Sequence, residues 1–481
     1  MERTLLQKRM LLAGEWVIGT NLIDVENPQD GEIIAQVPAA TKEEVLFAIQ
    51  EGVQGAEIAS RLSTFERMGI LKRAADWIDE KQSLFAETIA TEGSKTIREA
   101  RKEVMRCIET IRISAEEARR IHGETIPFDQ TAGNENRVGY YQRFPIGLIV
   151  AITPFNDPLN LVAHKLGPAI AAGNSIIIKP SSVTPISALL LAEAFTQAGL
   201  PKKILSVITG HSSEIGDVLV SHPDVRMISF TGGYEAGKII SSKAGIKKLS
   251  MELGSNSPCI VLKDADILEA VKAIASGAFW AAGQNCLGVQ RVYIEKEVYK
   301  IFEELVAEAT KQLSVGDKLS EETEMGPLIT EREAIRIEKL VQEALRNGAS
   351  LLCGGTRKGA FYSPTVLTNV DSNSKIAQEE IFGPVLILEK VNDLEEAIQK
   401  SNNVSYGLQA GIFTQNLDNA FKAIRELECG GVIVNDSSDF RIDAMPFGGV
   451  KQSGIGREGV AFSIQEMTEQ KVVCFKLNSN F

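Results

Sequence analysis

Residues 147–180 read GLIVAITPFNDPLNLVAHKLGPAIAAGNSIIIKP, and this stretch decides the fold class. It contains two short runs rich in Ile and Val, GLIVAIT (147–153) and SIIIKP (175–180), with a segment of helical character between them. Runs that are apolar at every position, instead of at alternate ones, are typical of strands buried on both faces. The stretch therefore predicts a strand–helix–strand unit of a parallel sheet flanked by helices.

The same alternation continues along the chain. Three further apolar runs are ILSVIT (204–209), RMISFT (226–231) and CIVL (259–262). The helical segment before ILSVIT ends in AGLP (198–201), with Gly near its end and Pro just beyond, as helices commonly end. From 267 to 430 a second series of helices and short apolar strands follows, so we predict two α/β units.

The N-terminal part has a different pattern. Residues 42–121 contain long, charged, amphipathic helical segments such as REARKEVMRCIETIRISAEEARR. The next segment, HGETIPFDQTAGNENRVGYYQRFP (122–145), is polar and strand-prone and has no helical period. We therefore expect an extra polar β-element beside the two α/β units.

The overall composition is that of an ordinary globular protein, with 481 residues of which 44% are hydrophobic and 24% charged. Chains of this length usually divide into two or three domains. The net charge is −12 and the basic residues are scattered, so we expect neither nucleic acid nor a membrane as a partner. No apolar run is long enough to span a bilayer, and MERTLLQKRMLLAGEW has no signal-peptide core, so we expect a cytoplasmic protein.

Cysteine and histidine are sparse. The six cysteines include no two within four residues of each other, and the four histidines are not paired at metal-binding intervals. We therefore expect no metal site and a reducing compartment.

Two glycine-rich segments are candidates for a phosphate loop. GIGREG (454–459) matches G-x-G-x-x-G, but it follows PFGGVKQS instead of a strand and so lacks the required context. FTGGYEAG (230–237) directly follows an apolar strand and opens a helical segment, so Gly232 and Gly233 are better placed to let a phosphate approach a helix N-terminus. Taken alone, the second segment is more often a plain strand-to-helix turn.

Four other residues have suitable chemistry in an ambiguous setting. Lys179 ends a buried strand, at the edge where open α/β sheets bind ligands. Glu252, in MELGSNSP, is flanked by apolar residues that suit a general base, and Asn156, between two prolines, suits an oxyanion donor. Cys286, in FWAAGQNCLGVQR, is either a nucleophile or a small buried hydrophobe. For the other three, a solvated lysine, a surface carboxylate and a turn cap are the ordinary alternatives.

The order of these segments removes most of the ambiguity. KPS, FTGG, ELG, GQNC, EEIFGP and PFGGVKQSGIGREG occur in sequence over nearly the whole chain. This series resembles that of the aldehyde dehydrogenase superfamily, whose members oxidise aldehydes to acids with NAD or NADP. The resemblance implies an α/β fold with a Rossmann-type dinucleotide-binding domain, an α/β catalytic domain and a small β oligomerisation element, which makes a homo-oligomer, either a dimer or a tetramer, the expected assembly.

The resemblance also implies roles for single residues. Cys286 is expected to be the nucleophile that adds to the aldehyde carbon, giving first a thiohemiacetal and then a thioester. Asn156 and the backbone N–H of Cys286 are expected to stabilise the oxyanion, and Glu252 to activate the water that hydrolyses the thioester. The residues expected to bind NAD or NADP are Thr153, Pro154, Lys179, Ser182, Gly232, Gly233, Glu380 and Phe382.

Three positions depart from the common pattern of the family. Ser182 stands where many members have a Glu that binds the adenosine ribose, and because serine does not repel a 2′-phosphate, we expect both NAD and NADP to be accepted. Gly233 stands where serine is frequent, which leaves more of the phosphate contacts to the backbone. Ser255 replaces the second glycine of ELGG, and the sequence offers no interpretation of it.

Three residues are candidates for binding the substrate. Arg441 and Arg106 match positions that line the substrate entrance in the family, and His164 takes a position that is often aromatic. Guanidinium groups suit carboxylate, phosphonate or sulfonate. We therefore expect a small anionic aldehyde, with sulfolactaldehyde, lactaldehyde or phosphonoacetaldehyde first, and succinate semialdehyde or glyceraldehyde 3-phosphate as alternatives.

Two other functions remain possible at this point. A CoA-acylating dehydrogenase would transfer the acyl group to CoA, but such members often lack the Glu that is present here as Glu252. A non-catalytic binding protein would need none of Cys286, Glu252 and Asn156.

The resemblance also implies a domain division. The dinucleotide-binding domain is expected in 1–121 and 140–250, with a returning piece at 431–460. The catalytic domain is expected in 251–430, and the oligomerisation element in 122–139 and 461–481.

Overall fold

The strand–helix–strand unit expected from 147–180 is present in the computed structural model, which describes residues 6–478. Strands β8 (Leu148–Ile152) and β9 (Ser175–Lys179) pair in parallel, and helix α5 (Asn160–Ala172) connects them. The helix ends at Gly173, whose left-handed φ of 84° turns the chain back toward the sheet. Every residue of α5 and β9 is buried, because helices and strands cover the unit on both faces.

This unit lies inside an eight-stranded sheet with the order β24-β12-β11-β8-β9-β10-β2-β3. Its other strands are β2 (Met10–Leu12), β3 (Glu15–Val17), β10 (Leu205–Val207), β11 (Met227–Thr231), β12 (Lys248–Glu252) and β24 (Gly454–Ile455). One face packs on α1 (Lys42–Arg61), α7 (Ser212–Ser221) and α8 (Tyr234–Ala244). The other packs on α5 together with α2 (Thr64–Glu80), α3 (Gln82–Glu92), α4 (Ile97–Ala118), α6 (Ile186–Gln197) and α15 (Val460–Glu466).

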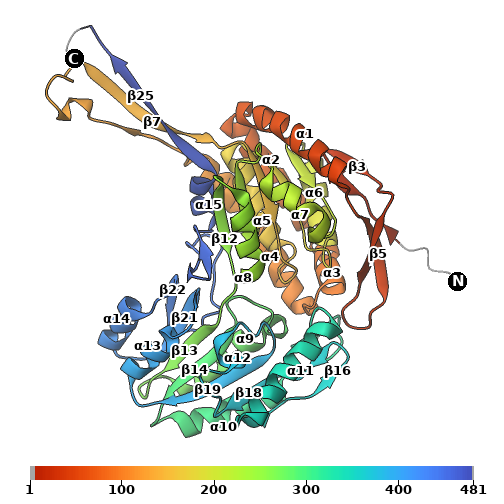
Figure 1. Ribbon diagram of the computed structural model, residues 1–481, viewed down its shortest axis with the longest axis vertical. Helices are drawn as coiled ribbons and strands as arrows, with labels where there is room; N and C mark the ends of the chain where they lie inside the picture. The colour runs from red at the N-terminus through yellow and green to blue at the C-terminus, as the bar shows by residue number, and fades with distance from the viewer. Residues whose placement is uncertain (1–5, 479–481) are drawn as a thin grey trace.

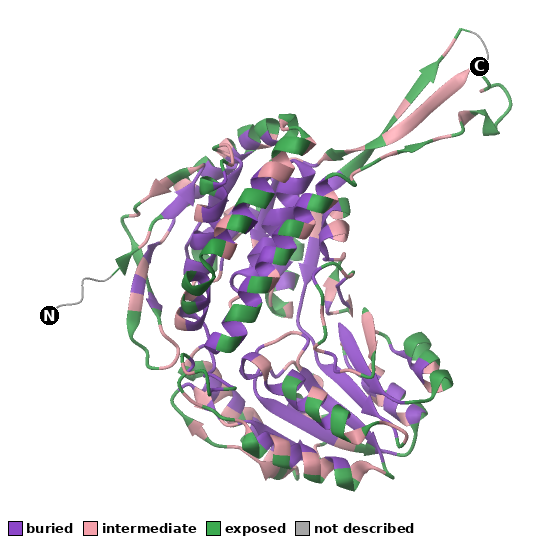
Figure 2. Cartoon of the chain, turned by 180° about the vertical axis from the view of Figure 1, so that it is seen from behind, coloured by how far each residue is buried: buried purple, intermediate pink, exposed green. Residues whose placement is uncertain are grey.

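A second sheet, of seven strands, forms the other half of the body and has the order β15-β18-β19-β14-β13-β21-β22. Its strands are β13 (Ser257–Val261), β14 (Val289–Glu295), β15 (Ser350–Cys353), β18 (Thr365–Thr368), β19 (Val385–Val391), β21 (Gln409–Phe413) and β22 (Gly431–Val434). Helices α9 (Ile267–Phe279), α10 (Tyr299–Gln312) and α11 (Glu331–Arg346) pack on one face, and α13 (Leu394–Asn402) and α14 (Leu417–Glu426) on the other. The short helix α12 (Lys375–Gln378) lies before β19. Figure 2 shows the buried strands inside each half and the exposed helix faces outside.

The polar segment forms an arm that projects from the body, as Figure 1 shows. The arm consists of β6 (Glu124–Thr125), β7 (Arg137–Pro145) and β25 (Thr468–Lys476), with β7 and β25 antiparallel along their whole length. At the N-terminal end, β1 (Leu6–Gln7), β4 (Leu22–Glu26) and β5 (Ile33–Pro38) form a small separate sheet. Two two-stranded ladders pair β16 (Arg357–Lys358) with β17 (Phe361–Tyr362) and β20 (Tyr406–Gly407) with β23 (Val450–Lys451). None of the helices within 6–478 is long and apolar enough to cross a membrane.

The boundaries between these units lie at slightly different residues from those expected. Strand β22, in the segment expected to return to the dinucleotide-binding domain, instead pairs in parallel with β21 at the edge of the seven-stranded sheet. Helix α15, in the segment expected to belong to the arm, buries Val460 and Ile464 against α5 in the first core. Both segments carry apolar residues that need a covering surface, and the nearest one is the body of the protein.

Candidate active site

A cavity of about 1040 Å³ is lined by residues of both α/β units. It adjoins the carboxyl ends of β8, β9, β11 and β12, which are parallel neighbours and so end at the same edge of the sheet. This edge is where open α/β sheets bind ligands. The cavity lining includes every residue expected to act in catalysis or cofactor binding, namely Asn156, Glu252, Cys286, Thr153, Pro154, Lys179, Ser182, Gly232, Gly233, Glu380 and Phe382.

The Cys286 thiol reaches this cavity from a loop that follows the 3-10 turn Trp280–Gly283. Burial raises the pKa of the thiol to about 12, and the Arg441 guanidinium acts in the opposite direction. The carboxyls of Glu380, Glu252 and Glu458 contribute to this increase. The thiol is therefore protonated at neutral pH, and Arg441 is the positive charge that favours its thiolate.

Glu252 ends β12 with its carboxyl group in the same cavity. It is 2% exposed, and neither carboxyl oxygen has a hydrogen-bond partner within the described chain. Burial raises its pKa well above the ordinary value, as does the nearby carboxylate of Glu458. A buried carboxyl with both oxygens free is suited to exchange a proton with a water or a thiol in the cavity.

Asn156 lies in the loop that follows β8, and contacts from other elements hold that loop. The ring of its neighbour Phe155 packs edge-on against Phe382, with centroids 5.7 Å apart. The carboxylate of the next residue, Asp157, pairs with Lys95 and lies 3.3 Å from Nη1 of Arg106. A loop fixed on both sides of Asn156 holds its amide ready, with little rearrangement needed at the moment of reaction.

The other end of the cavity has the groups that a dinucleotide needs. Lys179 donates to the carbonyl of Pro180 and has no carboxylate partner among the described residues, and burial lowers its pKa to about 8. The hydroxyl groups of Ser181, Ser182 and Ser212 line the wall near it. At Gly233 an added Cβ would meet nothing within 4 Å, so the space in front of the α8 N-terminus is open. The residues present therefore fit an adenosine phosphate on the Lys179 side.

Ser255, the residue that departs from the ELGG pattern, holds the Glu380 carboxyl in place through its backbone. The backbone N–H of Ser255 donates to Oε1 of Glu380 at 2.7 Å, and burial raises the pKa of Glu380 to about 7. At Gly254 a Cβ would come within 2.6 Å of the Glu380 carboxyl, so a side chain there would displace that carboxyl. At 255 the side chain instead points away and its hydroxyl lies 2.8 Å from that of Ser257, so a serine is accommodated.

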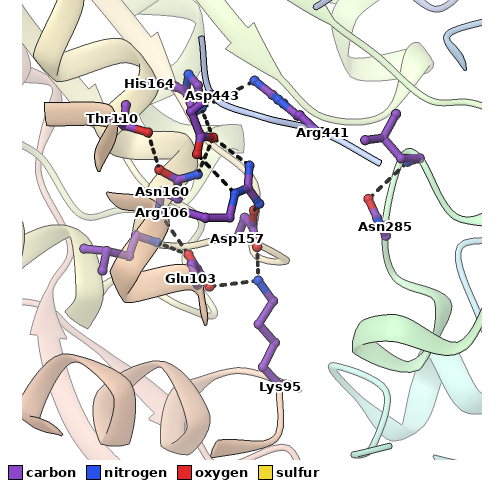
Figure 3. Close-up of polar contacts among 12 residues, drawn as sticks. Lys95, Glu103, Arg106, Thr110, Asp157, Asn160, His164, Asn285, Arg441 and Asp443 are labelled. Atoms are coloured by element: carbon purple, nitrogen blue, oxygen red, sulfur yellow. Dashed lines mark hydrogen bonds and ion pairs between the residues drawn. The ribbon is translucent and has the colours of Figure 1, made fainter. Parts of the chain in front are cut away.

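The three residues expected to bind the substrate lie together but do not line this cavity (Figure 3). Asp443 connects two of them: its Oδ1 lies 2.8 Å from Nε2 of His164 and 2.8 Å from Nη2 of Arg106. Burial would raise the pKa of Asp443, but His164 and Arg106 lower this pKa well below its usual range. Burial and the Arg441 charge lower the pKa of His164, whose Nδ1 has no hydrogen-bond partner within residues 6–478.

Sequence reasoning missed a buried ion pair between Lys165 and Glu458, near Glu252. Nζ of Lys165 lies 2.8 Å from Oε1 of Glu458, and Nη2 of Arg441 lies 3.3 Å from Oε2 of the same carboxylate. Burial would raise the pKa of Glu458, but Lys165 and Arg441 lower it to about 2. The signal for this pair is a lysine inside the apolar run of α5, because a buried charge needs a partner. That partner, Glu458, comes from the GIGREG segment that lacks the context of a phosphate loop.

The chain was compared with known proteins. Residues 16–473 match the aldehyde dehydrogenase family. The chain belongs to this family. It is an NAD(P)-dependent aldehyde dehydrogenase, as the relatives and structures below agree.

Two curated relatives show how closely the chain follows characterised members. Aspartate-semialdehyde dehydrogenase 1 of Pseudomonas canavaninivorans is 50% identical, over 95% of this chain and 97% of its own. The 3-sulfolactaldehyde dehydrogenase of Priestia megaterium is 46% identical, over 98% of both chains. The two relatives are named for different aldehydes.

Two solved structures show the same fold. Aldehyde dehydrogenase 21 from Physcomitrella patens, in complex with the reaction product succinate, superimposes with a TM-score of 0.97 and 39% identity over 100% of both chains. The glyceraldehyde-3-phosphate dehydrogenase GapN from Methanocaldococcus jannaschii, complexed with NADP, gives 0.92 and 40%, covering 95% of this chain and 100% of that one. The aldehyde dehydrogenase fold expected from the sequence is therefore confirmed.

Proposed function

We propose that this aldehyde dehydrogenase oxidises a small anionic aldehyde to its carboxylic acid through a thioester on Cys286. The convergence of Cys286, Glu252 and Asn156 on the wall of one cavity supports the chemistry. Arg441 does not line the cavity, but its charge close to Cys286 supports the anionic substrate. Its buried guanidinium lies close enough to Cys286 to lower the pKa of the thiol, and its Nε has no partner within the described chain.

The residues supply complementary parts of the reaction. Loss of the thiol proton lets Sγ of Cys286 add to the aldehyde carbon, while the Asn156 amide and the Cys286 N–H donate to the oxygen that becomes negative. The bound nicotinamide supplies the hydride acceptor. Collapse of the thiohemiacetal then leaves a thioester. Glu252 takes a proton from water, the hydroxide adds to the thioester carbon, and the acid leaves as the thiol re-forms.

The nucleotide side of the cavity supports the use of NADP as well as NAD. Ser182, in place of the Glu that many members of the family have, lines the same cavity as Lys179, Ser181 and Ser212. A 2′-phosphate would meet donors there instead of a like charge. The GapN structure that is 40% identical to this chain holds NADP.

The charge of the compounds named for two related proteins supports an anionic substrate. Among the proteins compared, one acts on 3-sulfolactaldehyde by name and one holds succinate, and both compounds are small anions. Sulfolactaldehyde and phosphonoacetaldehyde are the first anionic candidates, with succinate semialdehyde and glyceraldehyde 3-phosphate as alternatives, whereas lactaldehyde, also expected from the sequence, carries no charge. The chain keeps Glu252, which argues for hydrolysis of the thioester over transfer to CoA.

The test is a turnover screen with the purified protein, NAD and NADP, these five aldehydes, aspartate semialdehyde, and propanal as the neutral control. Absorbance at 340 nm follows reduction of the cofactor. We expect kcat/KM for at least one anionic aldehyde to exceed that for propanal by at least about tenfold, because charge-assisted hydrogen bonds contribute about 1.5–3 kcal/mol. Added CoA should yield no acyl-CoA. Equal efficiency on propanal contradicts the anion site, and undetectable turnover with NADP contradicts its use.

The same screen tests Arg441. The Arg441→Ala variant should raise KM for the best anionic aldehyde by at least about tenfold and change KM for propanal by less than about threefold, since only the anion loses a partner. Arg101→Ala is the control, because Arg101 lies on the outer surface of α4 and pairs with the exposed Glu321. Equal increases for both aldehydes would show that Arg441 does not recognise the anion.

A further inference from the structure

The turn that precedes Cys286 has an unusual backbone. Three consecutive residues, Ala281, Ala282 and Gly283, have left-handed φ values of 51°, 55° and 68°. Residues with a side chain rarely adopt this conformation, and it persists only where the surroundings hold it. At Gly283 an added Cβ would lie 2.2 Å from the carbonyl oxygen of Gly383, so the turn is also pressed against another loop. The turn therefore depends on contacts from outside itself.

The strongest of these contacts is a carboxyl group from the other half of the molecule. Glu99, in the first turn of α4, is 3% exposed. Its Oε1 accepts from the backbone N–H of Ala281 at 2.7 Å, and its Oε2 accepts from the N–H of Thr96 at 2.8 Å. Burial raises the pKa of Glu99, whereas these hydrogen bonds lower it. Both oxygens are thus committed, one to the cap of α4 and one to the start of the left-handed turn.

Other contacts extend this connection toward the nucleophile. The Gln284 side chain donates to the carbonyl of Ala281 at 3.0 Å and accepts from the N–H of Ile329 at 2.9 Å. Nζ of Lys102, one turn further along α4, lies 4.7 Å from the centroid of the Trp280 ring. Helix α4 therefore touches the segment at two consecutive residues, Trp280 and Ala281.

We propose that Glu99 is a positioning residue for Cys286. It holds the left-handed turn 281–283, and the turn sets the direction in which the chain carries Sγ of Cys286 into the cavity beside Glu252 and Asn156. If the turn relaxed to ordinary right-handed angles, the chain direction at 284–286 would change and the thiol would leave that geometry. Reaction rates fall steeply with such displacements. The proposal rests on the proposed role of Cys286 as the nucleophile.

The test replaces the carboxyl group by an amide. Glu99→Gln keeps the size of the side chain but has only one acceptor oxygen, so either Ala281 or Thr96 loses its partner. We expect kcat to fall at least tenfold and the rate of Cys286 alkylation by iodoacetamide at pH 8, followed by mass spectrometry, to fall with it. The KM for NAD or NADP should stay within twofold, because Glu99 does not line the cofactor cavity.

Thr96→Val is the matched control. The Thr96 hydroxyl accepts from the Glu99 N–H at 3.3 Å and caps α4, but it does not touch the turn. This variant weakens the same helix end and leaves the bond between Glu99 and Ala281 in place. Its kcat and Cys286 alkylation rate should stay within twofold of the unmodified protein.

One outcome overturns the proposal: a Glu99→Gln variant that matches Thr96→Val in kcat and in alkylation rate, whether both variants lose activity or neither does. If Glu99→Gln does not fold, Glu99→Asp, which keeps the charge but shortens the reach, replaces it with the same expectations. Because alkylation needs no aldehyde and no cofactor, it tests the positioning role even if the turnover screen finds no substrate. A failure of the proposed function is thereby distinguished from a failure of this inference.

Discussion

At the scale of single residues, the reactivity of Cys286 depends on two opposing effects. Burial and three nearby carboxyl groups favour the neutral thiol, and Arg441 favours the thiolate. The same guanidinium is the group proposed to bind the anionic end of the substrate. Substrate binding would then draw on the positive charge that favours the thiolate, so the two proposed roles of Arg441 would be coupled.

The pKa of Cys286 gives a direct prediction. Because the pKa is raised to about 12, the thiolate fraction in the free protein should rise about tenfold for each pH unit below that value. The alkylation rate of Cys286 should therefore increase without a plateau from pH 6 to 9. Arg441→Met should lower the rate at every pH, since it removes the charge that favours the thiolate.

Cys474 provides the internal control for that experiment. It is exposed on the arm, in β25, and its labelling should be the same in both proteins. A plateau in the Cys286 rate below pH 8 would show that the free protein already holds a thiolate. An unchanged rate in Arg441→Met would show that the guanidinium does not act on the thiol.

The site residues that could be predicted from the sequence are those that belong to recognisable local strings. Cys286, Glu252 and Asn156 each stand in a short segment, and the order of the segments along the chain pointed to a shared function. Asp443 and Glu458 were not found, because their role depends on partners, His164 and Lys165, that are distant in sequence. Glu99 was not found for the same reason, since its bond to Ala281 spans 182 positions.

At the scale of secondary structure, the buried ion pair between Lys165 of α5 and Glu458 of the C-terminal segment is expected to stabilise the fold. Removing one partner of a buried ion pair leaves the other charge uncompensated and typically costs about 3–5 kcal/mol. Glu458→Gln should therefore lower the midpoint of thermal unfolding at pH 7 by at least about 5 °C. Glu428→Gln, which changes an exposed partner of Lys451, should shift it by about 2 °C or less.

The pH dependence of this effect has a defined sign. The pKa of Glu458 is lowered to about 2 in the folded protein, from an ordinary value of 4.5. The stabilisation by Glu458 is therefore complete above pH 4.5 and is lost as the pH falls toward 2. The difference between the unmodified protein and Glu458→Gln should shrink across that range. A difference that stays constant down to pH 2 would show that ionisation of Glu458 does not stabilise the fold.

The longer elements were predictable and the shortest were not. Strands such as β9 and β11 were expected because a continuous apolar run has few alternatives to a buried strand. Strand β24 has only two residues, Gly454 and Ile455, and forms because β12 offers a free edge beside it. No local pattern encodes such a pairing, so the departures from the expected domain limits occur mainly in this C-terminal part of the chain.

At the scale of the whole molecule, the arm is the feature that a single chain leaves unexplained. Val472 and Phe475 of β25 are 61% and 49% exposed, and Phe144 of β7 is 37% exposed. A long strand pair that carries exposed apolar side chains invites pairing with another chain. We therefore expect a homo-oligomer, as proposed from the sequence, in which the arm contacts a second copy.

The assembly can be tested by light scattering after size exclusion. The unmodified protein should elute as a dimer or a tetramer, and a Val472→Asp, Phe475→Asp double variant should elute at a smaller mass, because charge would be buried in the contact. Leu268→Asp is the control, since Leu268 is 68% exposed on α9, away from the arm. A monomeric unmodified protein, or a double variant of unchanged mass, contradicts the prediction.

The position of β24 also affects how the protein forms on the ribosome. Glu252 of β12 pairs with Gly454, about two hundred residues later in the chain. Until that segment has been synthesised, β12 is the outermost strand of its sheet, and Glu458 is not yet present to pair with Lys165. Domains that fold during synthesis complete in order from the N-terminus, but this one has to wait for its last strand. A nascent chain that stops after the second sheet therefore carries Cys286 without the complete cavity around it.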